Sequence, residues 1–374
     1  MDFSLSDDQR LLKESVEQYI TRDYPFEKRR AHAALGDGFS REAWAAMATL
    51  GWPGAALPVA YGGSGGGAVE TMLMMEELGR GLVVEPLLAT AILGGGLILG
   101  GGTETQKADL LPTLIEGRLL LAFAYTERQS RHDLHHVELT AVKHGAGYWL
   151  NGQKSVVLNG DSADMIIVSG RTGGDVRDRS GISLFLVDAA SAGLGLRGYA
   201  TMDGMRAAEI NFDQAEATLI SEADGALPLI EQTIDQAAVA VMAEALGIMA
   251  VINDLTLEYL KTREQFGQPI GKFQALQHRM VDMVIAAEES RSLVMVAAMQ
   301  ADGEANVRAR AVSAAKVQIA RAGRLIGQEA VQLHGAIAMT DDYQLGHYFK
   351  RLTMIGQLFG DSDHHLRRFA QLNG

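Results

Sequence analysis

The chain has 374 residues, of which 47% are hydrophobic and 21% charged, so it is long enough for a large core and for two or three domains. It contains no cysteine, which excludes disulfides, zinc thiolates and a cysteine nucleophile. A net charge of −13, with no basic run beyond Lys28-Arg29-Arg30, argues against nucleic acid or an anionic membrane as partner.

Residues 1–119 have the apolar spacing of helices. Ser6 is expected to begin the first helix, with Leu11 among its inward residues, and Ser40 a later one that turns Leu50 inward. Thr103 is expected to open a third helix, closed at Gly117. The first eight residues are acidic and no window has about 18 uninterrupted apolar residues, so we expect neither a signal peptide nor a membrane span, and hence a soluble cytoplasmic protein.

From residue 120 to about 222 the apolar period changes to two, which predicts short strands. Asn151-Gly152 and Asn159-Gly160 are expected to form tight turns between strands. The charged, glycine-rich segment from Arg171 to Arg179 is expected to be an exposed loop. Strands without intervening helices favour an antiparallel sandwich or barrel over a dinucleotide-binding α/β fold. The expected strands are 120–124, 139–143, 148–150, 155–158, 165–169, 182–187 and 208–212.

From residue 223 to 374 the helical period returns. Leu229 to Lys261 is expected to be one long helix, followed by helices over about 273–300, 307–332 and 344–358 and a short one after Asp361. Long helices with short links predict a four-helix bundle. The fold class is therefore α+β, with domains 1–119 (helical), 120–222 (β) and 223–374 (bundle).

Gly267, Pro269 and Gly271 interrupt the bundle pattern, so the chain must turn there and hold Arg263 at the corner between two helices. A guanidinium fixed at a corner suits a phosphate or pyrophosphate, because its planar fork donates two parallel hydrogen bonds. A capping arginine in a surface turn is the alternative, and the spacing alone leaves both open.

Four motifs in this order carry a resemblance to a known family over nearly the whole chain. They are Leu57-Pro-Val-Ala-Tyr-Gly-Gly63, Ala124-Tyr-Thr-Glu127, Thr262-Arg-Glu-Gln-Phe-Gly-Gln-Pro-Ile270 and Ala330-Val-Gln-Leu-His-Gly335. With them the chain resembles the acyl-CoA dehydrogenases, flavoproteins that bind FAD and act on acyl-CoA thioesters.

The resemblance implies an FAD site built from two subunits. The β domain would contribute a segment along the flavin and a second wall, in which Val156 and Leu158 stand where the family usually has Trp and Thr. The bundle corner would reach a neighbour's FAD, with Arg263 on its pyrophosphate. The implied contacts are Phe123, Tyr125 and Thr126 along the flavin; Val156, Val157 and Leu158 on the wall; Arg263, Phe266, Ile270, Phe273 and Leu276 at the corner; Gln332, Leu333, Gly335 and Ala336 at the adenosine end; and Ser362 and His364 near the chain's own cofactor.

The family's catalytic base is a glutamate, and this chain has Gly360 at the matching position. The position used by other members, counted back from Arg263, is Ala237. Asp361 is the candidate base, although it also suits the cap of the last helix, and the two readings stay open. Glu244 lies in an apolar stripe and is expected to pair with an arginine of another helix, while Asp235 is expected to be exposed.

The loop expected at the substrate mouth, Arg128-Gln-Ser-Arg-His-Asp133, is bulkier and more cationic than the small glycine-rich segment that the family often has. It would narrow or charge the pocket, or block it. His132, His135 and His136 have no convincing ligand spacing with other donors, so no metal site is expected.

Three functions remain. The first is a subunit of a heteromeric acyl-CoA dehydrogenase, similar to the small subunit of pimeloyl-CoA-type or steroid side-chain enzymes, in which a paralogous subunit carries the glutamate. The second is a homotetramer that uses Asp361 as its base, and the third is a non-catalytic scaffold. For the enzymes the resemblance implies a dimer or tetramer with FAD at the subunit interface, a role in lipid degradation and an electron-transfer flavoprotein as acceptor.

Overall fold

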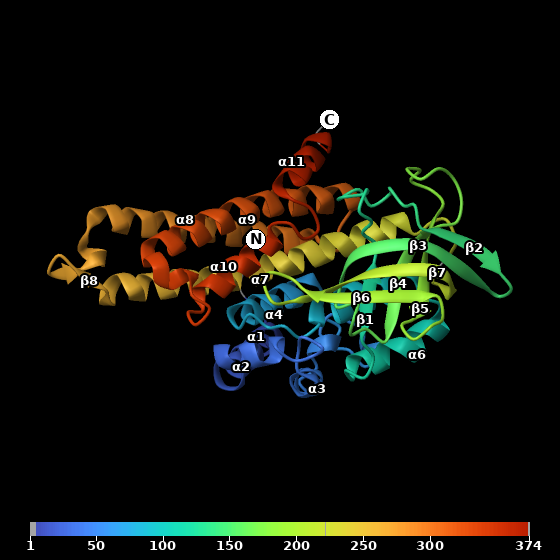
Figure 1. The fold of residues 1–374 in the computed structure, drawn as a ribbon, viewed down its shortest axis with the longest axis horizontal. Coiled ribbons are helices and arrows are strands. Elements are labelled where there is room, and N and C mark those ends of the chain that lie inside the picture. Colours follow the sequence, from blue (N-terminus) through green and yellow to red (C-terminus); the bar gives the residue numbers. More distant parts are fainter. Residues whose placement is uncertain (1–4, 221, 373–374) are drawn as a thin grey trace. The chain divides into compact units, whose positions relative to one another are not determined.

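The computed structural model describes residues 5–220 and 222–372 and divides into two compact units (Figure 1). One unit is helical and comprises Met1–Arg30, Ala68–Val83 and Ala238–Gly374. The other contains the sheet and comprises Ala31–Gly67 and Val84–Ala237. The order of elements, helices first, then strands, then a helical bundle, confirms the predicted fold class.

The sheet closes into a barrel because β4 pairs both with β2 and with β5, while β5, β7, β3 and β2 pair in succession. Most pairings are antiparallel, as expected, but β1 and β2 each pair with β4 in parallel. The strands are β1 (Leu121–Ala124), β2 (Thr140–His144), β3 (Gly147–Leu158), β4 (Met165–Arg171), β5 (Ile182–Asp188), β6 (Leu194–Ala200) and β7 (Arg206–Ile220).

Alternating apolar residues from six strands fill the barrel, as a two-residue period requires. Large side chains such as Phe185 and Phe212 meet alanines of the facing strands there. The same unit contains the helical elements α3 (Arg41–Thr49), η1 (Trp52–Gly54), η2 (Val59–Tyr61), η3 (Leu88–Gly95), α5 (Gly96–Gly101) and α6 (Glu104–Ile115).

Three details of the predicted β domain were wrong. Asn151-Gly152 is no hairpin turn but lies inside β3, because β7 absorbs the irregularity with an extra residue, Gln214, whose amide donates to Asn151 Oδ1 at 3.0 Å. The strand β6 has no clear apolar alternation and was missed. Arg171 is not part of an exposed loop, because it ends β4 and its guanidinium is buried against backbone carbonyls. The turn at Asn159-Gly160 is confirmed.

The helical unit is built around α7, whose range agrees with the predicted long helix and whose first residues belong to the barrel unit. By length and composition α7 could cross a membrane, but 72% of its most apolar window is buried inside the protein, as in the core helix of a soluble protein. The helices are α1 (Asp7–Asp23), α2 (Phe26–Ala33), α4 (Ala68–Arg80), α7 (Leu227–Thr262), α8 (Gln274–Gln300), α9 (Ala305–His334), η5 (Gly335–Met339), α10 (Leu345–Ile355) and α11 (Ser362–Gln371); η4 (Ile270–Lys272) and the short β8 (Glu264–Gln265) and β9 (Gln268–Pro269) form the corner after α7.

Helix α4 crosses α7 at close range. A Cβ added to Gly79 would lie 2.1 Å from the Glu244 carbonyl oxygen, and one added to Gly247 would lie 1.9 Å from that of Glu76. Only glycine fits at both positions, because any side chain would push the two helices apart.

The helix starts predicted at Ser6, Ser40 and Thr103 are confirmed, and two inward residues are not. Ser6 and Ser40 accept hydrogen bonds from the first turns of α1 and α3. Leu50 is exposed because α3 ends at Thr49, so the helical period no longer applies to it. Leu11 is exposed because at 100° per residue it lies about 140° around α1 from the buried Val16.

Candidate active site

The wall predicted on the barrel unit is a β-bulge in strained backbone. Between Lys154 and Val157, β3 has one residue more than β7, and the extra residue, Val156, has φ +52°. A β-branched residue in this region is a genuine outlier. Its side chain is 43% exposed, while its amide donates to Glu209 Oε1 at 3.3 Å. Such strain persists where surrounding contacts enforce it, and it is typical of functional sites.

The segment that follows β1 lies against this bulge. The Ser155 amide donates to the Thr126 carbonyl oxygen at 2.8 Å, so Thr126 and Val156 are neighbours although 30 positions separate them in the chain. Phe123 is buried and its ring stacks on Tyr125 at 5.0 Å between centroids. The structure thus brings Thr126 and Val156 together, whereas Val157 is buried in the barrel core. An outward apolar side chain beside fixed backbone groups suits a flat ring system.

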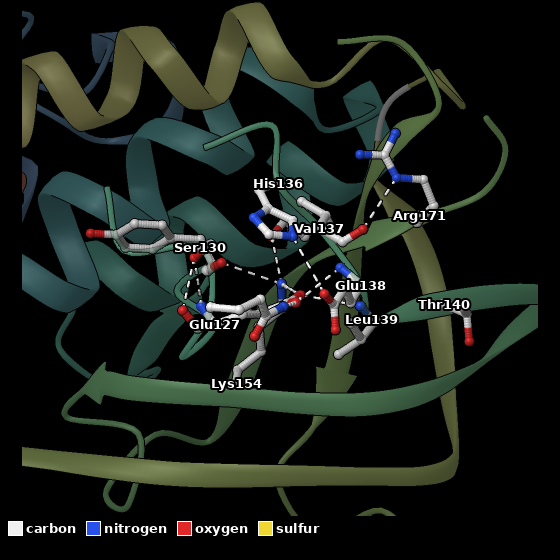
Figure 2. A network of polar contacts seen from close by, with 12 residues as sticks. Glu127, Ser130, His136, Val137, Glu138, Leu139, Thr140, Lys154 and Arg171 are labelled. Carbon is white, nitrogen blue, oxygen red and sulfur yellow. Dashed lines mark hydrogen bonds and ion pairs between the residues drawn. The ribbon is translucent and has the colours of Figure 1, made fainter. Parts of the chain in front are cut away.

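Sequence reasoning missed the charged residue beneath this segment. Lys154 is fully buried and donates to Glu127 Oε1 at 2.7 Å (Figure 2). A signal existed, because Leu150 and Lys154 are four residues apart in one strand and therefore point to the same face. The period of two that places Leu150 in the core places the lysine there as well.

Of the predicted contacts at the corner after α7, Arg263 and Phe266 are exposed, and Ile270, Phe273 and Leu276 are half-buried. Arg263 is exposed, and its carbonyl oxygen accepts from the Ile270 amide at 2.8 Å, which closes the turn. Phe266 has φ +54°, is 92% exposed and meets Phe273 edge to face. The corner therefore displays a large aromatic side chain at the surface of this chain.

The remaining predicted contacts of the helical unit lie at opposite ends of α9. Near its C-terminus Gln332 is exposed, while Leu333 is buried, and stacking of His334 on Tyr259 ties this end to the corner. Gly335 and Ala336 follow there and are exposed as well.

Ser362 and His364 belong instead to α11, which packs on the other half of α9, where His365 Nδ1 lies 3.2 Å from Ser313 Oγ. Ser313 and His334 are 21 positions apart on one straight element, which corresponds to about 30 Å. One chain therefore presents two separate groups of predicted contacts.

A side chain at the position of the usual base would force its neighbours to move and would strain the backbone. Gly360 has φ +113°, and an added Cβ would lie 2.6 Å from His365 Nε2 and 2.7 Å from His364 Cδ2. The carbonyl oxygens of Ile355 and Gly360 accept from Nζ of the buried Lys316 at 2.7 and 3.0 Å. Burial lowers the pKa of Lys316 to about 7, against the opposing charge of Asp361.

The alternative base positions have other surroundings. Asp361 is the N-cap of α11, with Oδ1 accepting from the His364 amide at 2.8 Å, which is the capping arrangement left open above. Ala237 is fully buried in α7. Burial, with help from the charge of Lys316, lowers the pKa of His365 to about 2, so its imidazole is neutral.

One of the two predictions for acidic residues of α7 is confirmed and the other is wrong. Glu244 pairs with Arg351 of α10 through two buried hydrogen bonds of 2.6 and 2.7 Å. Asp235, which was expected to be exposed, is only 1% exposed. The reason is that other parts of the protein cover more sides of α7 than the positions of its polar residues predict.

The loop after Glu127 keeps its cations at the surface, since Arg128 and Arg131 are exposed. Its histidines have acidic neighbours: His135 lies 2.6 Å from Asp133, and His136 lies 3.3 Å from Glu138. Within residues 5–220 and 222–372, no group of three or more His, Cys, Asp and Glu side chains has the arrangement of a metal site.

Comparisons with known proteins cover almost the whole chain. The family description "Acyl-CoA dehydrogenase, N-terminal domain" matches residues 6–118, the middle domain matches 122–215 and the C-terminal domain matches 225–372. A short-chain specific acyl-CoA dehydrogenase of Clostridium acetobutylicum is 30% identical, over 92% of this chain and 92% of its own.

Two solved structures have a similar fold. The FAD complex of PigA has a TM-score of 0.91 and 26% identity and covers 100% of both chains. The ChsE4-ChsE5 complex from Mycobacterium tuberculosis has a TM-score of 0.89 and 25% identity and covers 99% of this chain and 98% of that chain.

Proposed function

Because the chain belongs to the acyl-CoA dehydrogenase family, we propose that it is an FAD-binding subunit of a heteromeric enzyme for the α,β-dehydrogenation of an acyl-CoA thioester. The family makes it an oxidoreductase of the type that acts on CH–CH bonds, with FAD as its cofactor. A second, paralogous subunit supplies the carboxylate that removes the α-proton.

The observation that carries this division of labour is Gly360. Its φ of +113° and its distance to His364 and His365 exclude the glutamate side chain that the reaction needs. Proton removal requires a base within hydrogen-bond reach of the substrate, and Ala237, the other position the family uses, has no carboxylate. A chain that keeps the fold but closes this position depends on a base from elsewhere.

The retained residues fit FAD. Thr126 and the backbone around it would donate to the flavin ring, Val156 would cover it, and Arg263 would neutralise the pyrophosphate through its fork of N–H donors. When bound, FAD accepts the hydride that leaves the β-carbon of the substrate. The part of this chain is to bind and orient that ring and to exclude water from one side of it.

Assembly is supported by the two groups of contacts at opposite ends of α9, since one chain then serves two FAD sites, its own and a neighbour's. The exposed Phe266 and an exposed apolar stripe on α8 supply surface for association. The stripe consists of Val281, Val284, Ile285, Val296 and Met299. The similarity to the ChsE4-ChsE5 complex favours an assembly of two different subunits. We propose an electron-transfer flavoprotein in the cytoplasm as the electron acceptor.

The proposal is tested by expressing this chain alone and together with an acyl-CoA dehydrogenase paralogue from the same genome, beginning with any that is encoded beside it. We expect the co-purified pair to contain FAD and to oxidise members of an acyl-CoA panel, and this chain alone to be inactive. The control is the pair with the partner's glutamate changed to glutamine, which should also be inactive. Ordinary acyl-CoA oxidation by the lone chain would show that no partner base is needed.

A homotetramer that uses Asp361 as its base is the second candidate, because this carboxylate directly follows Gly360. In that enzyme Asp361→Asn should lower turnover by roughly 10²-fold or more, the scale of a general base, although asparagine is an equally good helix cap. An unchanged rate would leave Asp361 with its capping role only. A third possibility, a scaffold without FAD, predicts that the purified protein stays colourless after FAD is added.

A further inference from the structure

We propose that Lys154 and Glu127 are positioning residues that hold the segment Tyr125–Thr126 against the flavin and fix it relative to the bulge at Val156. The inference rests on the proposed function, because it assumes that this segment and the bulge face FAD. Both side chains are buried within the barrel unit and act through the backbone that they hold.

The ammonium of Lys154 has three N–H donors and three acceptors in the barrel unit. They are the Tyr125 carbonyl oxygen at 3.3 Å, Glu127 Oε1 at 2.7 Å and Ser169 Oγ at 3.1 Å. The side chain is 0% exposed, so no water competes for these donors. One buried charge therefore ties the segment after β1 to strands β3 and β4.

The carboxylate of Glu127 is equally occupied. Besides Lys154, it accepts from the amides of Glu138 and Leu139 at 2.9 and 3.1 Å and from Gln129 Nε2 at 2.6 Å. Burial raises the pKa of Glu127, but the ammonium and the two amides more than offset this and leave the pKa below its ordinary value. The carboxylate thus connects the segment after β1 with Gln129 of the predicted loop and with the chain just before β2.

Lys154 lies on β3 beside one predicted flavin contact, and Glu127 directly follows the other in the chain. Lys154 precedes Val156 by two residues, and the amide between them, that of Ser155, donates to the Thr126 carbonyl oxygen. Ser130 adds a clamp, because its hydroxyl accepts from the Glu127 amide at 3.1 Å. The positions of Thr126 and Val156 are therefore set by one strand and one buried charge pair.

Stability alone gives no reason to keep these charges. A buried ion pair replaced by apolar residues of similar volume is often no less stable, whereas removing one partner is strongly destabilising. A pair that serves only the fold should therefore be replaceable by two hydrophobic residues. A pair that positions backbone should not be, because only the ammonium can hold the Tyr125 carbonyl.

The experiment compares Lys154→Met, Glu127→Leu and the double variant with the wild type, all as the full chain in its purified assembly. Unfolding by denaturant measures stability, titration of the apoprotein measures the Kd for FAD, and the absorption spectrum reports the surroundings of the bound flavin. Asp164→Ala is the matched control, because Asp164 accepts from the Leu120 amide at 2.8 Å and so anchors the opposite end of β1.

We expect both single variants to be unstable and the double variant to regain most of the stability while its Kd for FAD stays at least about tenfold weaker, the equivalent of one lost hydrogen bond. Its flavin spectrum should also shift. The Asp164→Ala control should lose stability without either change. A double variant with wild-type Kd and spectrum would overturn the proposal.

Ser169→Ala serves if the double variant does not fold, because it removes a single neutral acceptor of Lys154. It should weaken FAD binding severalfold, and a loss of stability with unchanged binding would again contradict a positioning role. Failure of the proposed function looks different, because the wild type itself would then not bind FAD. Amide exchange of residues 125–130 in the apoprotein would still decide the positioning role: faster exchange in the variants supports it, and unchanged exchange refutes it.

Discussion

Two backbone positions with positive φ, Val156 in the barrel unit and Gly360 in the helical unit, were both singled out by the sequence, the first as a flavin contact and the second as the position of the missing base. Val156 has φ +52°, although it is β-branched, and it keeps a side chain that is 43% exposed. Gly360 has φ +113° and neighbours that leave no room for a Cβ. The first position accepts strain to present a side chain, and the second has the residue type for which positive φ costs least.

At Val156 the chain keeps a wall for the predicted flavin, whereas at Gly360 it lacks the carboxylate that the family uses as its base. The wall at Val156 is supported by Glu209, by Ser155 and by the pair Lys154–Glu127, so its conformation is enforced from several strands. The turn at Gly360 is also held in place, because its carbonyl oxygen accepts from Lys316, but His364 and His365 occupy the space beside its α-carbon.

Gly360→Ala tests the turn before α11, and we expect it to have the largest effect. The methyl group would meet His364 and His365, and alanine strongly disfavours this backbone, so we expect a loss of about 1–3 kcal/mol in the free energy of unfolding. Gly356→Ala, in the same loop at an ordinary φ of −58°, is the matched control and should cost less. Equal effects at the two positions would show that the corner tolerates a side chain.

The buried Lys316 predicts a pH dependence of stability. Its pKa falls from an ordinary 10.5 to about 7 on folding, mainly through burial. Between pH 7 and 10.5 the unfolded chain therefore binds more protons, so the contribution of this group to stability rises with pH through that window and is least below pH 7. The slope for one proton is at most about 1.4 kcal/mol per pH unit.

Lys316→Met should remove this slope, measured as the unfolding free energy at several pH values from 7 to 10. Lys350→Met is the control, because it deletes the same charge from an only partly buried side chain of α10. If the pH dependence of the unfolding free energy persisted in Lys316→Met but was lost in Lys350→Met, the titrating group would not be Lys316. The view that the turn at Gly360 is organised around this lysine would then be weakened.

Val156→Gly tests the bulge in β3, and we expect it to have the smallest effect on stability. Relief of the strained backbone is worth about 1–2 kcal/mol, and the greater freedom of glycine in the unfolded chain returns up to about 1 kcal/mol. We therefore expect unchanged or slightly increased stability together with weaker FAD binding, measured by denaturant unfolding and by titration of the apoprotein. Stronger FAD binding would mean that the side chain does not cover the flavin.

Patterns of local origin were predictable. The period of α7 gave its range to within two residues at either end, and Ser6 and Ser40 were identified as caps because a cap depends on three or four neighbouring residues. The partner type of Glu244 followed from the cost of burying an unpaired charge in an apolar stripe. The order of the motifs was enough to identify the family. The glycine at position 360, where the family has its catalytic glutamate, can be read directly from the sequence.

The sequence by itself thus determined the order of the elements, the family and the missing carboxylate. Only the tertiary structure decided that Asp235 is buried, that Arg171 is held by backbone carbonyls and that Asn151 serves a bulge rather than a turn. It also decided that Lys154 reaches Tyr125 and Glu127, and that His364 and His365 close the position beside Gly360. The reason is physical: a period or a cap depends on residues within one turn, whereas burial and backbone strain depend on neighbours that only the folded chain brings together.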